Sequence, residues 1–226
     1  MVISVALGPR DIQSAASVKA YRVALSVSVV GTVVIEITGD LLYLDVDAVC
    51  ITTNGFRREN GHAVWGAGLA KQARDRWPDI EAVAGVALGQ YGNHVRMLTY
   101  YDGSGISLVG TRTKSLPYHL VTFPTKPANI VVAADQSNIL PYYRTQYEAG
   151  HLAPGWVALS TIDLVERSTR ERLLLVVHTP GTRIALPMVG CGRGGLSYPD
   201  LVRPYLQGVL DDRFRVCTTR TREPRV

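Results

Sequence analysis

The sequence predicts an α/β fold, a three-layer sandwich in which helices cover both faces of a mixed central sheet. Short apolar runs rich in β-branched residues, typical of buried strands, alternate with segments whose apolar residues have helical spacing. Hydrophobic residues make up 46% and charged residues 19% of the chain, which is the composition of a protein with a packed core and not of a disordered one. Alternation of this kind is typical of sheets with helices on both faces.

The first expected elements precede a glycine-rich stretch. Residues 23–37 are rich in valine and partly alternating, which predicts one or two strands. Residues 47–53 (DAVCITT) form a short apolar run that predicts a buried strand. Glycines are frequent over residues 54–68. Residues 69–77 then place their apolar side chains on one face and predict a helix that ends before Pro78.

The middle of the chain is less regular. Residues 95–101 and residues 118–123 each predict a strand, and Pro124 is expected to end the second of them. Residues 127–155 show no clear period and form the longest irregular stretch, which we expect to be an insertion or a mobile lid. Residues 156–174 have helical spacing.

The last third predicts one strand, one helix and a final strand. Residues 183–187 (RIALP) form a short buried strand that leads directly into a glycine-rich run. A helix is expected over residues 199–210, with Pro204 either kinking it or delaying its start. Residues 215–218 predict the final strand.

The expected organisation is one domain over residues 31–218. It lies between an N-terminal extension, residues 1–30, to which we assign no role, and a basic tail, residues 219–226. The net charge is +5, and five arginines lie within the last fourteen residues. Such a tail is commonly a solvated chain end, but it also suits contact with phosphate, so contact with nucleic acid stays open.

Several classes of protein are disfavoured by the composition. The three cysteines are widely spaced, and neither they nor the five histidines show the spacing of metal ligands, which argues against a disulfide framework and a zinc site. The most apolar stretch, residues 23–37, is too short and too polar to span a bilayer, and the start lacks the features of a signal peptide. We therefore expect a cytoplasmic protein with neither a metal nor a membrane partner.

Two glycine-rich turns are the clearest candidates for a binding site. The first is GHAVWGAGLAKQA (residues 61–73) and the second is GCGRGGLSYPD (residues 190–200), and each opens a predicted helix. Glycine allows the backbone to approach an anion closely, and the N–H groups at a helix start point toward it. Two such loops suit the two phosphates of a diphosphate, although the glycines also fit tight turns. Neither is a Walker A motif or a GxGxxG fingerprint, which disfavours a P-loop kinase and a classical dehydrogenase.

These motifs give the chain a resemblance to a known family. After a Gly-Asp pair, four runs follow in the order found in macrodomains, the ADP-ribose-binding fold: DAVCITTN (47–54), WGAGLAKQ (65–72), FPTK (123–126) and LPMVGCGRGGL (186–196). The chain most resembles the branch of the DarG-type antitoxins, which remove ADP-ribose from DNA. The resemblance extends over about residues 33–218 and leaves residues 127–155 unmatched.

The resemblance implies an ADP-ribose site. Asp40 would accept a hydrogen bond from the adenine amino group and Asn54 would face the distal ribose, although each also suits a turn. The two glycine loops would hold the diphosphate. The remaining residues that the resemblance places at the ligand are Gly66, Ala67, Gly68, Phe123, Gly190, Cys191, Gly192, Arg193 and Gly194.

Lys126 and Asn54 are the catalytic residues that the resemblance implies. A lysine beside the ribose can stabilise charge at the anomeric carbon, contact the modified base, or attack a ribose aldehyde once its pKa falls; alternatively it is an exposed loop lysine. Two departures bear on catalysis more than on binding. Ile51 stands where the DarG-like pattern has a second asparagine, and Gly194 stands where related lysine–aspartate hydrolases carry an aspartate.

The expected function is to bind ADP-ribose and to hydrolyse it from a modified target such as DNA, within a toxin–antitoxin pair and without a cofactor. Two alternatives stay open: a non-catalytic binding module for ADP-ribose or a derivative, and a phosphatase for ADP-ribose 1″-phosphate. His62 is a weaker candidate for a proton donor. Four aromatic residues in or beside the unmatched stretch can stack on a base or pack a long loop: Tyr142, Tyr143, Tyr147 and Trp156.

Overall fold

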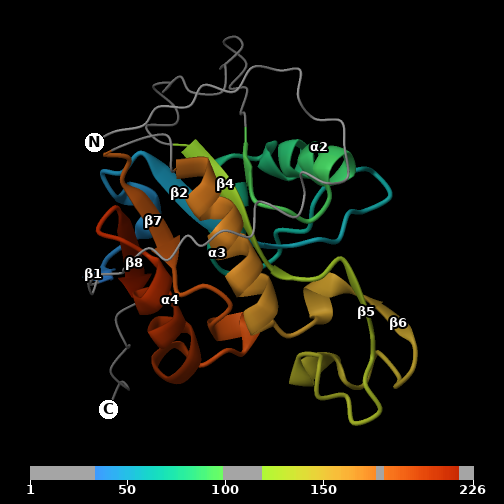
Figure 1. Cartoon of the computed structure of the whole chain (residues 1–226). Helices are drawn as coiled ribbons and strands as arrows, with labels where there is room; N and C mark the ends of the chain where they lie inside the picture. The colour runs from blue at the N-terminus through green and yellow to red at the C-terminus, as the bar shows by residue number, and fades with distance from the viewer. Residues whose placement is uncertain (1–33, 99–118, 177–180, 219–226) are drawn as a thin grey trace, which may run out of the picture. The chain divides into compact units, whose positions relative to one another are not determined.

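A computed structural model of the chain describes residues 34–98, 119–176 and 181–218 (Figure 1). Within these residues the main sheet has six strands in the order β1–β8–β7–β2–β4–β3. In this order the strands are β1 (Ile35–Thr38), β8 (Phe214–Thr218), β7 (Ile184–Pro187), β2 (Ala48–Asn54), β4 (His119–Lys126) and β3 (Arg96–Met97). Neighbouring strands are parallel except for β3, which pairs with β4 in the antiparallel direction. The prediction of a mixed sheet is therefore confirmed.

The central strands are apolar because both of their faces are covered. In β2 the first four residues, Ala48–Ile51, are buried, and in β7 the first three are buried. Strands that are buried on both faces have continuous apolar runs instead of alternating ones. This explains why the sequence locates β2 and β7 to within about a residue.

Two helices cover one face of the sheet. They are α1 (Gly68–Arg76) and α2 (Ile80–Tyr91), which contribute Ala73 and Ile80 to a core that also contains the β2 residues Val49 and Ile51. Trp65, which is 1% exposed, packs in the same core just before α1 begins. This core supports the loop that leads into α1.

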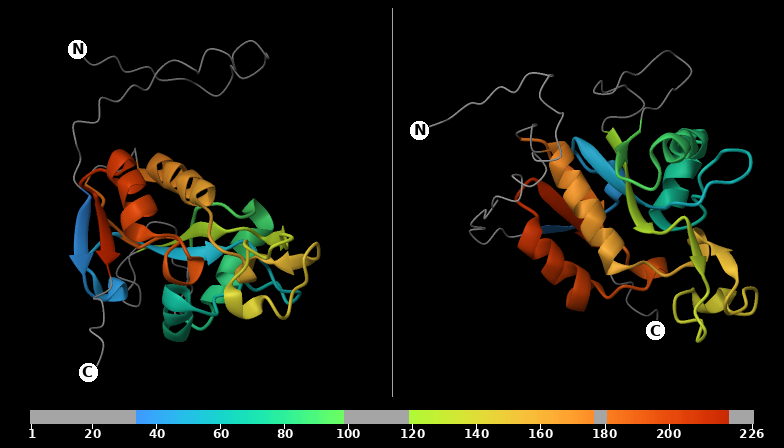
Figure 2. Two further views of the ribbon diagram at one scale, coloured as in Figure 1. Left: turned by 90° about the horizontal axis from the view of Figure 1, so that it is seen from below. Right: turned by 45° about the vertical axis from the view of Figure 1, so that its right-hand side comes forward.

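The opposite face carries the other two helices, so the fold is the expected three-layer sandwich (Figure 2). They are α3 (Ile162–Val176) and α4 (Arg203–Val209). Val165 of α3 and Leu206 of α4 pack on strand residues that include Cys50. A five-residue π-helical turn, Tyr198–Val202, precedes α4, and Pro204 lies in the first turn of α4, so the predicted delay of this helix is observed.

The segment of residues 127–160, here called the hairpin segment, differs from the irregular stretch that we expected. It contains a second sheet in which β5 (Asn129–Val131) pairs antiparallel with β6 (Leu152–Pro154), as well as two 3-10 turns. Its own small core contains Val132, Ile139, Ala153 and Val157. The segment is thus a small folded unit attached to the end of β4.

Two strand predictions need correction or fall partly outside the described residues. Pro124 does not end β4, which continues to Lys126. The register with β2 shifts beside Pro124, and such irregularities accommodate a residue that has no N–H to donate. Of the predicted strands over residues 23–37 and 95–101, the structure describes only β1 and the short β3; residues 1–30 and 219–226 also lie outside the described parts.

Candidate functional site

A cleft with a volume of about 870 Å³ lies at the carboxyl ends of the parallel strands. Open α/β sheets bind ligands at this edge, and ligand sites commonly have volumes of about 300–1,000 Å³. The two glycine loops line the cleft, and so do Asp40, Asn54 and Lys126. The structure therefore brings together predicted site residues that lie up to 154 positions apart in the sequence, from Asp40 to Gly194.

The strand order arranges these residues along one axis. Asp40 follows β1, the second glycine loop follows β7, Asn54 ends β2 and Lys126 ends β4. Four strand spacings separate β1 from β4, which amounts to about 19 Å at roughly 4.8 Å each. Asp40 and Lys126 thus stand at opposite ends of a long cleft, with the glycine loops between them.

The first glycine loop leads directly into α1. Ala67 is extended and precedes the helix, and Gly68 has a φ of 57°, a left-handed conformation that favours glycine. A Cβ atom placed on Gly66 or Gly68 would meet no protein atom within 4 Å. The first N–H groups of a helix have no partner within it, so this loop presents donors on the cleft side.

The second glycine loop turns sharply after β7. Gly192 has a φ of 60° and also has open space where a side chain would begin, whereas Gly194 is buried. A Cβ atom on Gly194 would lie 2.4 Å from Oγ of Ser160, whose backbone N–H donates to the Gly194 carbonyl at 2.8 Å. Burial raises the pKa of the Cys191 thiol to about 11, which agrees with a packed thiol and not with a nucleophile.

Asp40 has both of the features considered from the sequence. Its Oδ1 accepts a hydrogen bond from the Leu42 N–H at 3.0 Å and caps the 3-10 turn Leu41–Tyr43. It also lines the cleft, and its Oδ2 has no hydrogen-bond partner among the described residues. A ligand donor can therefore reach one carboxylate oxygen while the other holds the turn.

Asn54 is engaged by the backbone of its own loop. Its Oδ1 accepts from the Phe56 N–H at 3.0 Å, and its Nδ2 donates to the Val64 carbonyl at 2.9 Å. An amide group has two acceptor sites and two N–H groups, so one of each is left for a ligand. The side chain thus holds the loop together at the cleft wall.

Lys126 points its ammonium toward two backbone carbonyls. Nζ donates to the Arg193 carbonyl at 3.1 Å and lies 3.4 Å from the Trp156 carbonyl. Burial, and secondarily the positive charge of Arg193, lower the pKa of Lys126 to about 8. The residue is therefore a half-buried amine between the second glycine loop and the hairpin segment, and not an exposed loop lysine.

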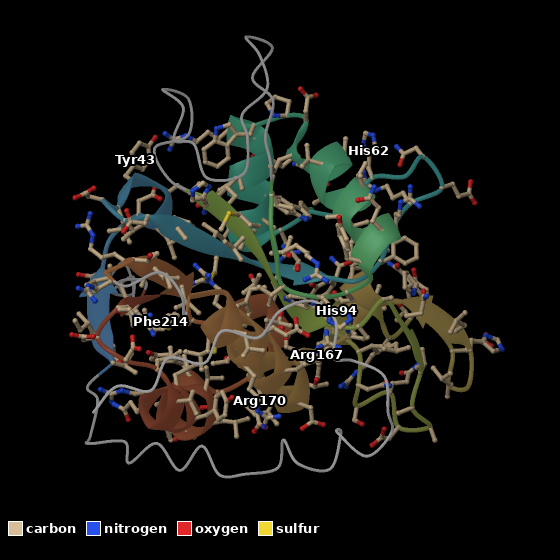
Figure 3. All side chains as sticks on the ribbon, turned by 45° about the horizontal axis from the view of Figure 1, so that its top comes forward. Tyr43, His62, His94, Arg167, Arg170 and Phe214 are labelled. Carbon is tan, nitrogen blue, oxygen red and sulfur yellow. The ribbon has the colours of Figure 1, made fainter. Side chains whose placement is uncertain are left out.

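The backbone of Lys126 is held from the other side by the loop between α2 and β3. Asn93 donates from Nδ2 to the Lys126 carbonyl at 2.9 Å. The side chain of Arg167, on α3, donates to the Asn93 carbonyl beside the exposed ring of His94 (Figure 3). Glu171 accepts from the Val95 N–H at 2.8 Å and so fastens the same loop to α3.

Two predicted or candidate residues lie away from the cleft. Phe123 is 0% exposed and packs in the core beneath α3, and it is not among the described residues that line the cleft. His62 does not line the cleft either. The cleft also contains residues that the sequence did not assign to ADP-ribose, among them Arg58, Leu140, Tyr142, Tyr143 and Trp156. The sequence marked Tyr142, Tyr143 and Trp156 only as aromatic residues that can stack on a base, and it gave no signal for Arg58 or Leu140.

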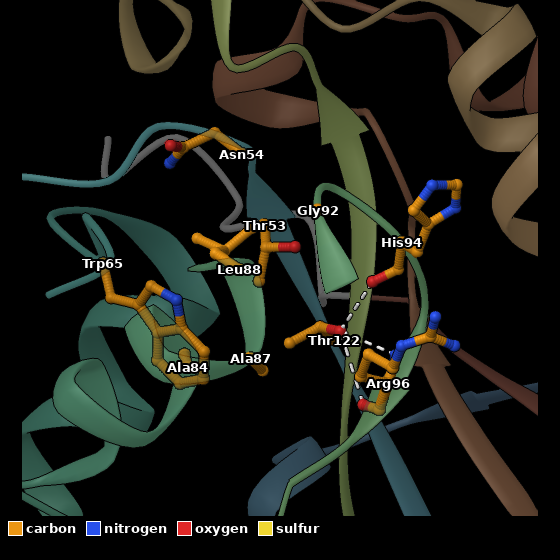
Figure 4. Close-up of a pocket in the computed structure, with 10 residues that line it drawn as sticks. All are labelled: Thr53, Asn54, Trp65, Ala84, Ala87, Leu88, Gly92, His94, Arg96 and Thr122. Carbon is orange, nitrogen blue, oxygen red and sulfur yellow. Dashed lines mark hydrogen bonds between the residues drawn. The ribbon is translucent and has the colours of Figure 1, made fainter. Parts of the chain in front are cut away.

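A second cavity, between α2 and β4, is too small for such a ligand (Figure 4). Its volume is about 10 Å³, roughly the minimum for one water molecule. Thr122 closes one side, where its Oγ1 accepts from the Arg96 N–H at 2.9 Å. In the described parts of the chain, no group of three or more His, Cys, Asp or Glu side chains can hold a metal ion, and no helix is long and apolar enough to cross a membrane.

Comparison with known proteins gives matches in structure but not in sequence. No protein-family model matches the chain, and no curated protein matches it. The macrodomain of Mycobacterium tuberculosis DarG is similar in structure, with a TM-score of 0.53 and 19% identity over 83% of this chain and 98% of that one. The macrodomain of Thermus aquaticus DarG gives a TM-score of 0.50 and 21% identity over 82% of this chain and 96% of that one.

A third similar structure is Thermosipho africanus DarTG in complex with ADP-ribose. The TM-score is 0.51 and the identity 20%, over 83% of this chain and 42% of that one, so this chain matches less than half of it. Together with the structural match, sequence identities of about 20% show that these proteins and this chain share a fold. The chain has the macrodomain fold, as the order of its motifs predicted.

Proposed function

We propose that the protein binds ADP-ribose in this cleft and removes it from a modified target, with DNA as the leading candidate. The observation that carries the proposal is the order of groups along the cleft: a carboxylate, two glycine loops and a half-buried lysine. The Thermosipho africanus DarTG structure, which contains ADP-ribose, supports the same ligand.

The proposed pose follows this order. Adenine lies at Asp40, whose free carboxylate oxygen accepts from the exocyclic amine. The diphosphate lies between the loop before α1 and the loop at Gly192, where the N–H groups at a helix start and the open space at the glycines favour an anion. The distal ribose then lies near Asn54 and Lys126.

The reaction is a hydrolysis at C1″ of the distal ribose. The bond between C1″ and the acceptor atom breaks, and its electron pair leaves with the acceptor. The oxygen of water bonds to C1″ and keeps one proton as the new hydroxyl of ADP-ribose. The other proton of the water goes to the acceptor, either directly or by restoring a proton that Lys126 has given to the acceptor. Positive charge develops on the sugar in the transition state, so orientation and electrostatics supply the catalysis.

Lys126 has two roles open to it in this step. As an ammonium it donates a proton or a hydrogen bond to the departing acceptor, and a pKa of about 8 is close to the value that suits a general acid at neutral pH. As a neutral amine it can instead attack C1″: the bond from C1″ to the lysine nitrogen forms while the bond from C1″ to the acceptor breaks, and the acceptor leaves with the electron pair and takes up the proton that the amine loses. Water then hydrolyses the bond between C1″ and the nitrogen, which yields ADP-ribose and restores the amine. Replacement by arginine separates the two roles, since arginine keeps the charge but offers no nucleophilic amine.

The alternative function is that of a binding module without catalysis. Ile51, three positions before Asn54, is fully buried in the core under α1 and α2, so this position brings no polar group to the ribose. Asn54 itself is largely engaged by its own loop. These two observations make a binding module the second candidate function.

One experiment distinguishes the two functions. The protein is incubated with an ADP-ribosylated oligonucleotide, free ADP-ribose is measured over time, and ADP-ribose affinity is measured by calorimetry. Binding together with release supports the hydrolase. Binding without release supports the module, and the absence of both contradicts the proposed function.

A further inference from the structure

The hairpin segment presents an aromatic side chain to the cleft. Tyr142 is 51% exposed and lines the cleft together with Tyr143 and Trp156. The exposed part of this ring is therefore open to contact by a ligand in the cleft.

Tyr142 is held by a stack of rings behind it. Its ring centroid lies 4.5 Å from that of Tyr143, and Tyr143 meets Trp156 edge to face at 5.1 Å and Tyr147 at 6.4 Å. The inner three rings pack on the small core of the hairpin segment. The outer ring is therefore backed by packed neighbours, and a side chain that is already held in place loses less entropy when a ligand binds.

Three contacts place this ring at the lysine end of the cleft. The guanidinium of Arg193 lies 5.8 Å from the centre of the Tyr142 ring. The backbone carbonyl of the same Arg193 accepts from Lys126 at 3.1 Å, and the carbonyl of Trp156 lies 3.4 Å from the same ammonium. These contacts place the ring at the end of the cleft where Lys126 lies.

The charged residues at the lysine end of the cleft favour some ADP-ribosylated acceptors over others. Lys126 and Arg193 are both basic, and Asp40, at the opposite end, is the single carboxylate among the described residues that line the cleft. An exposed ring beside an arginine, with a lysine at the same end of the cleft, suits a planar base followed by phosphates, because bases stack on aromatic side chains and phosphates pair with arginine and lysine. Among the described residues that line the cleft, this end has no carboxylate that could pair with the amine or guanidinium of a peptide.

We propose that Tyr142 is the specificity-determining residue for the acceptor: its ring stacks on the nucleobase joined to the distal ribose, and Arg193 contacts the adjoining phosphate. This inference rests on the proposed function and adds the hairpin segment to it. The hairpin segment lies outside the motifs that gave the chain its resemblance to macrodomains.

The test measures affinity for three ligands: ADP-ribose, an oligonucleotide carrying ADP-ribose on one base, and a peptide carrying ADP-ribose on serine. Every protein carries Lys126→Ala so that the conjugates stay intact. In this background we compare Tyr142 with Tyr142→Ala, with Tyr142→Phe, which keeps the ring, and with Tyr91→Ala, which removes a 54% exposed tyrosine outside the cleft. Thermal unfolding confirms that each variant is folded.

With Tyr142 present we expect the oligonucleotide conjugate to bind about tenfold or more tightly than ADP-ribose, the scale of one stacked base. Tyr142→Ala should remove this preference and leave ADP-ribose affinity within about twofold, whereas Tyr142→Phe and Tyr91→Ala should keep it. Three outcomes would overturn the inference about Tyr142 but leave the proposed function standing. They are a preference for the oligonucleotide conjugate that survives Tyr142→Ala, an equal loss of affinity for ADP-ribose and the oligonucleotide conjugate, and a preference for the peptide conjugate. No binding of ADP-ribose when Tyr142 is present would refute the proposed function as well.

Discussion

Lys126 occupies the position on which removal of ADP-ribose depends. Its backbone is fixed by Asn93 and its Nζ by the carbonyls of Arg193 and Trp156, so the amine is held at one end of the cleft. Its lowered pKa, about 8, leaves the ammonium as the main form at pH 7. A cation of this kind can lose its proton to a departing acceptor at neutral pH.

The rate of release should therefore depend on pH through Lys126. The ammonium is present below about pH 8 and is lost as the pH rises through that value, so the rate should be flat near pH 7 and fall above about pH 8. Lys126→Arg should be slower but should lack this fall, because a guanidinium keeps its proton. Initial rates between pH 6 and 9.5 provide the measurement. A rate that rises through pH 8 would indicate attack by the amine and contradict this prediction.

Asp40 can be tested for its two roles separately. Asp40→Ala removes both the ligand acceptor and the cap of the Leu42 N–H, so it should weaken ADP-ribose binding by about 1–3 kcal/mol and lower stability. Asp40→Asn keeps an oxygen for the cap but loses the charge, so it should weaken binding while thermal stability is retained. Calorimetry and thermal unfolding on both variants provide the comparison. Full affinity in Asp40→Asn would remove the carboxylate from the site.

For single residues, the sequence predicted well which positions line the cleft. It predicted less well what the side chains at those positions do. Asn54 lines the cleft as expected, but its amide holds the Phe56 N–H and the Val64 carbonyl. Phe123 belongs to the FPTK motif yet packs in the core. A motif identifies positions along a strand, but successive side chains of a strand point to opposite faces of the sheet, so the motif alone does not say which of them enter the core.

The second glycine loop is the element that should be most sensitive to substitution. Gly192→Glu would place a charged side chain in the open space at Gly192 and repel a diphosphate, so ADP-ribose binding should be abolished. Gly150→Glu is the matched control, since Gly150 also has a positive φ and open space but does not line the cleft. Calorimetry on both folded variants provides the comparison. Unchanged affinity in Gly192→Glu would exclude this loop from the site.

The attachment of the hairpin segment to β4 depends on one close approach. A Cβ atom on Gly155 would lie 1.7 Å from the Pro127 carbonyl, so Gly155→Ala should lower the free energy of unfolding by about 1–3 kcal/mol. Gly208→Ala, in α4, meets no atom within 4 Å and should be neutral or stabilising by up to about 1 kcal/mol. Denaturant unfolding measures both. Equal stability of Gly155→Ala and the unmodified protein would show that the segment is loosely attached.

Elements were predictable where local pattern and burial agree. Strands β2 and β7 are apolar on both faces and were located from the sequence. Helix α2 was missed because its apolar residues surround it instead of forming a stripe. β4 was expected to end at Pro124, but the sheet continues past a local shift in register, and the hairpin segment has a core of long-range contacts that no local pattern reveals.

The described fold provides a framework that other proteins share. Two cores, one on each face of the sheet, fix the strand order, and this order sets the positions of the groups along the cleft. The macrodomains of the two DarG proteins have this fold although their sequences are only about 20% identical to this chain. A core needs apolar residues at the right positions, but it tolerates different apolar residues there. The glycine loops, in contrast, depend on residue type, which is why they carried the resemblance.

The most direct test of the account is release of ADP-ribose from an ADP-ribosylated oligonucleotide by the unmodified protein and by Lys126→Ala. We predict release by the unmodified protein and a loss of about 10²-fold or more in Lys126→Ala, the scale of a lost catalytic group. Calorimetry should show that ADP-ribose affinity changes far less, since the diphosphate contacts lie at the glycine loops. Release by Lys126→Ala at the unmodified rate, or no release by the unmodified protein, would contradict the account.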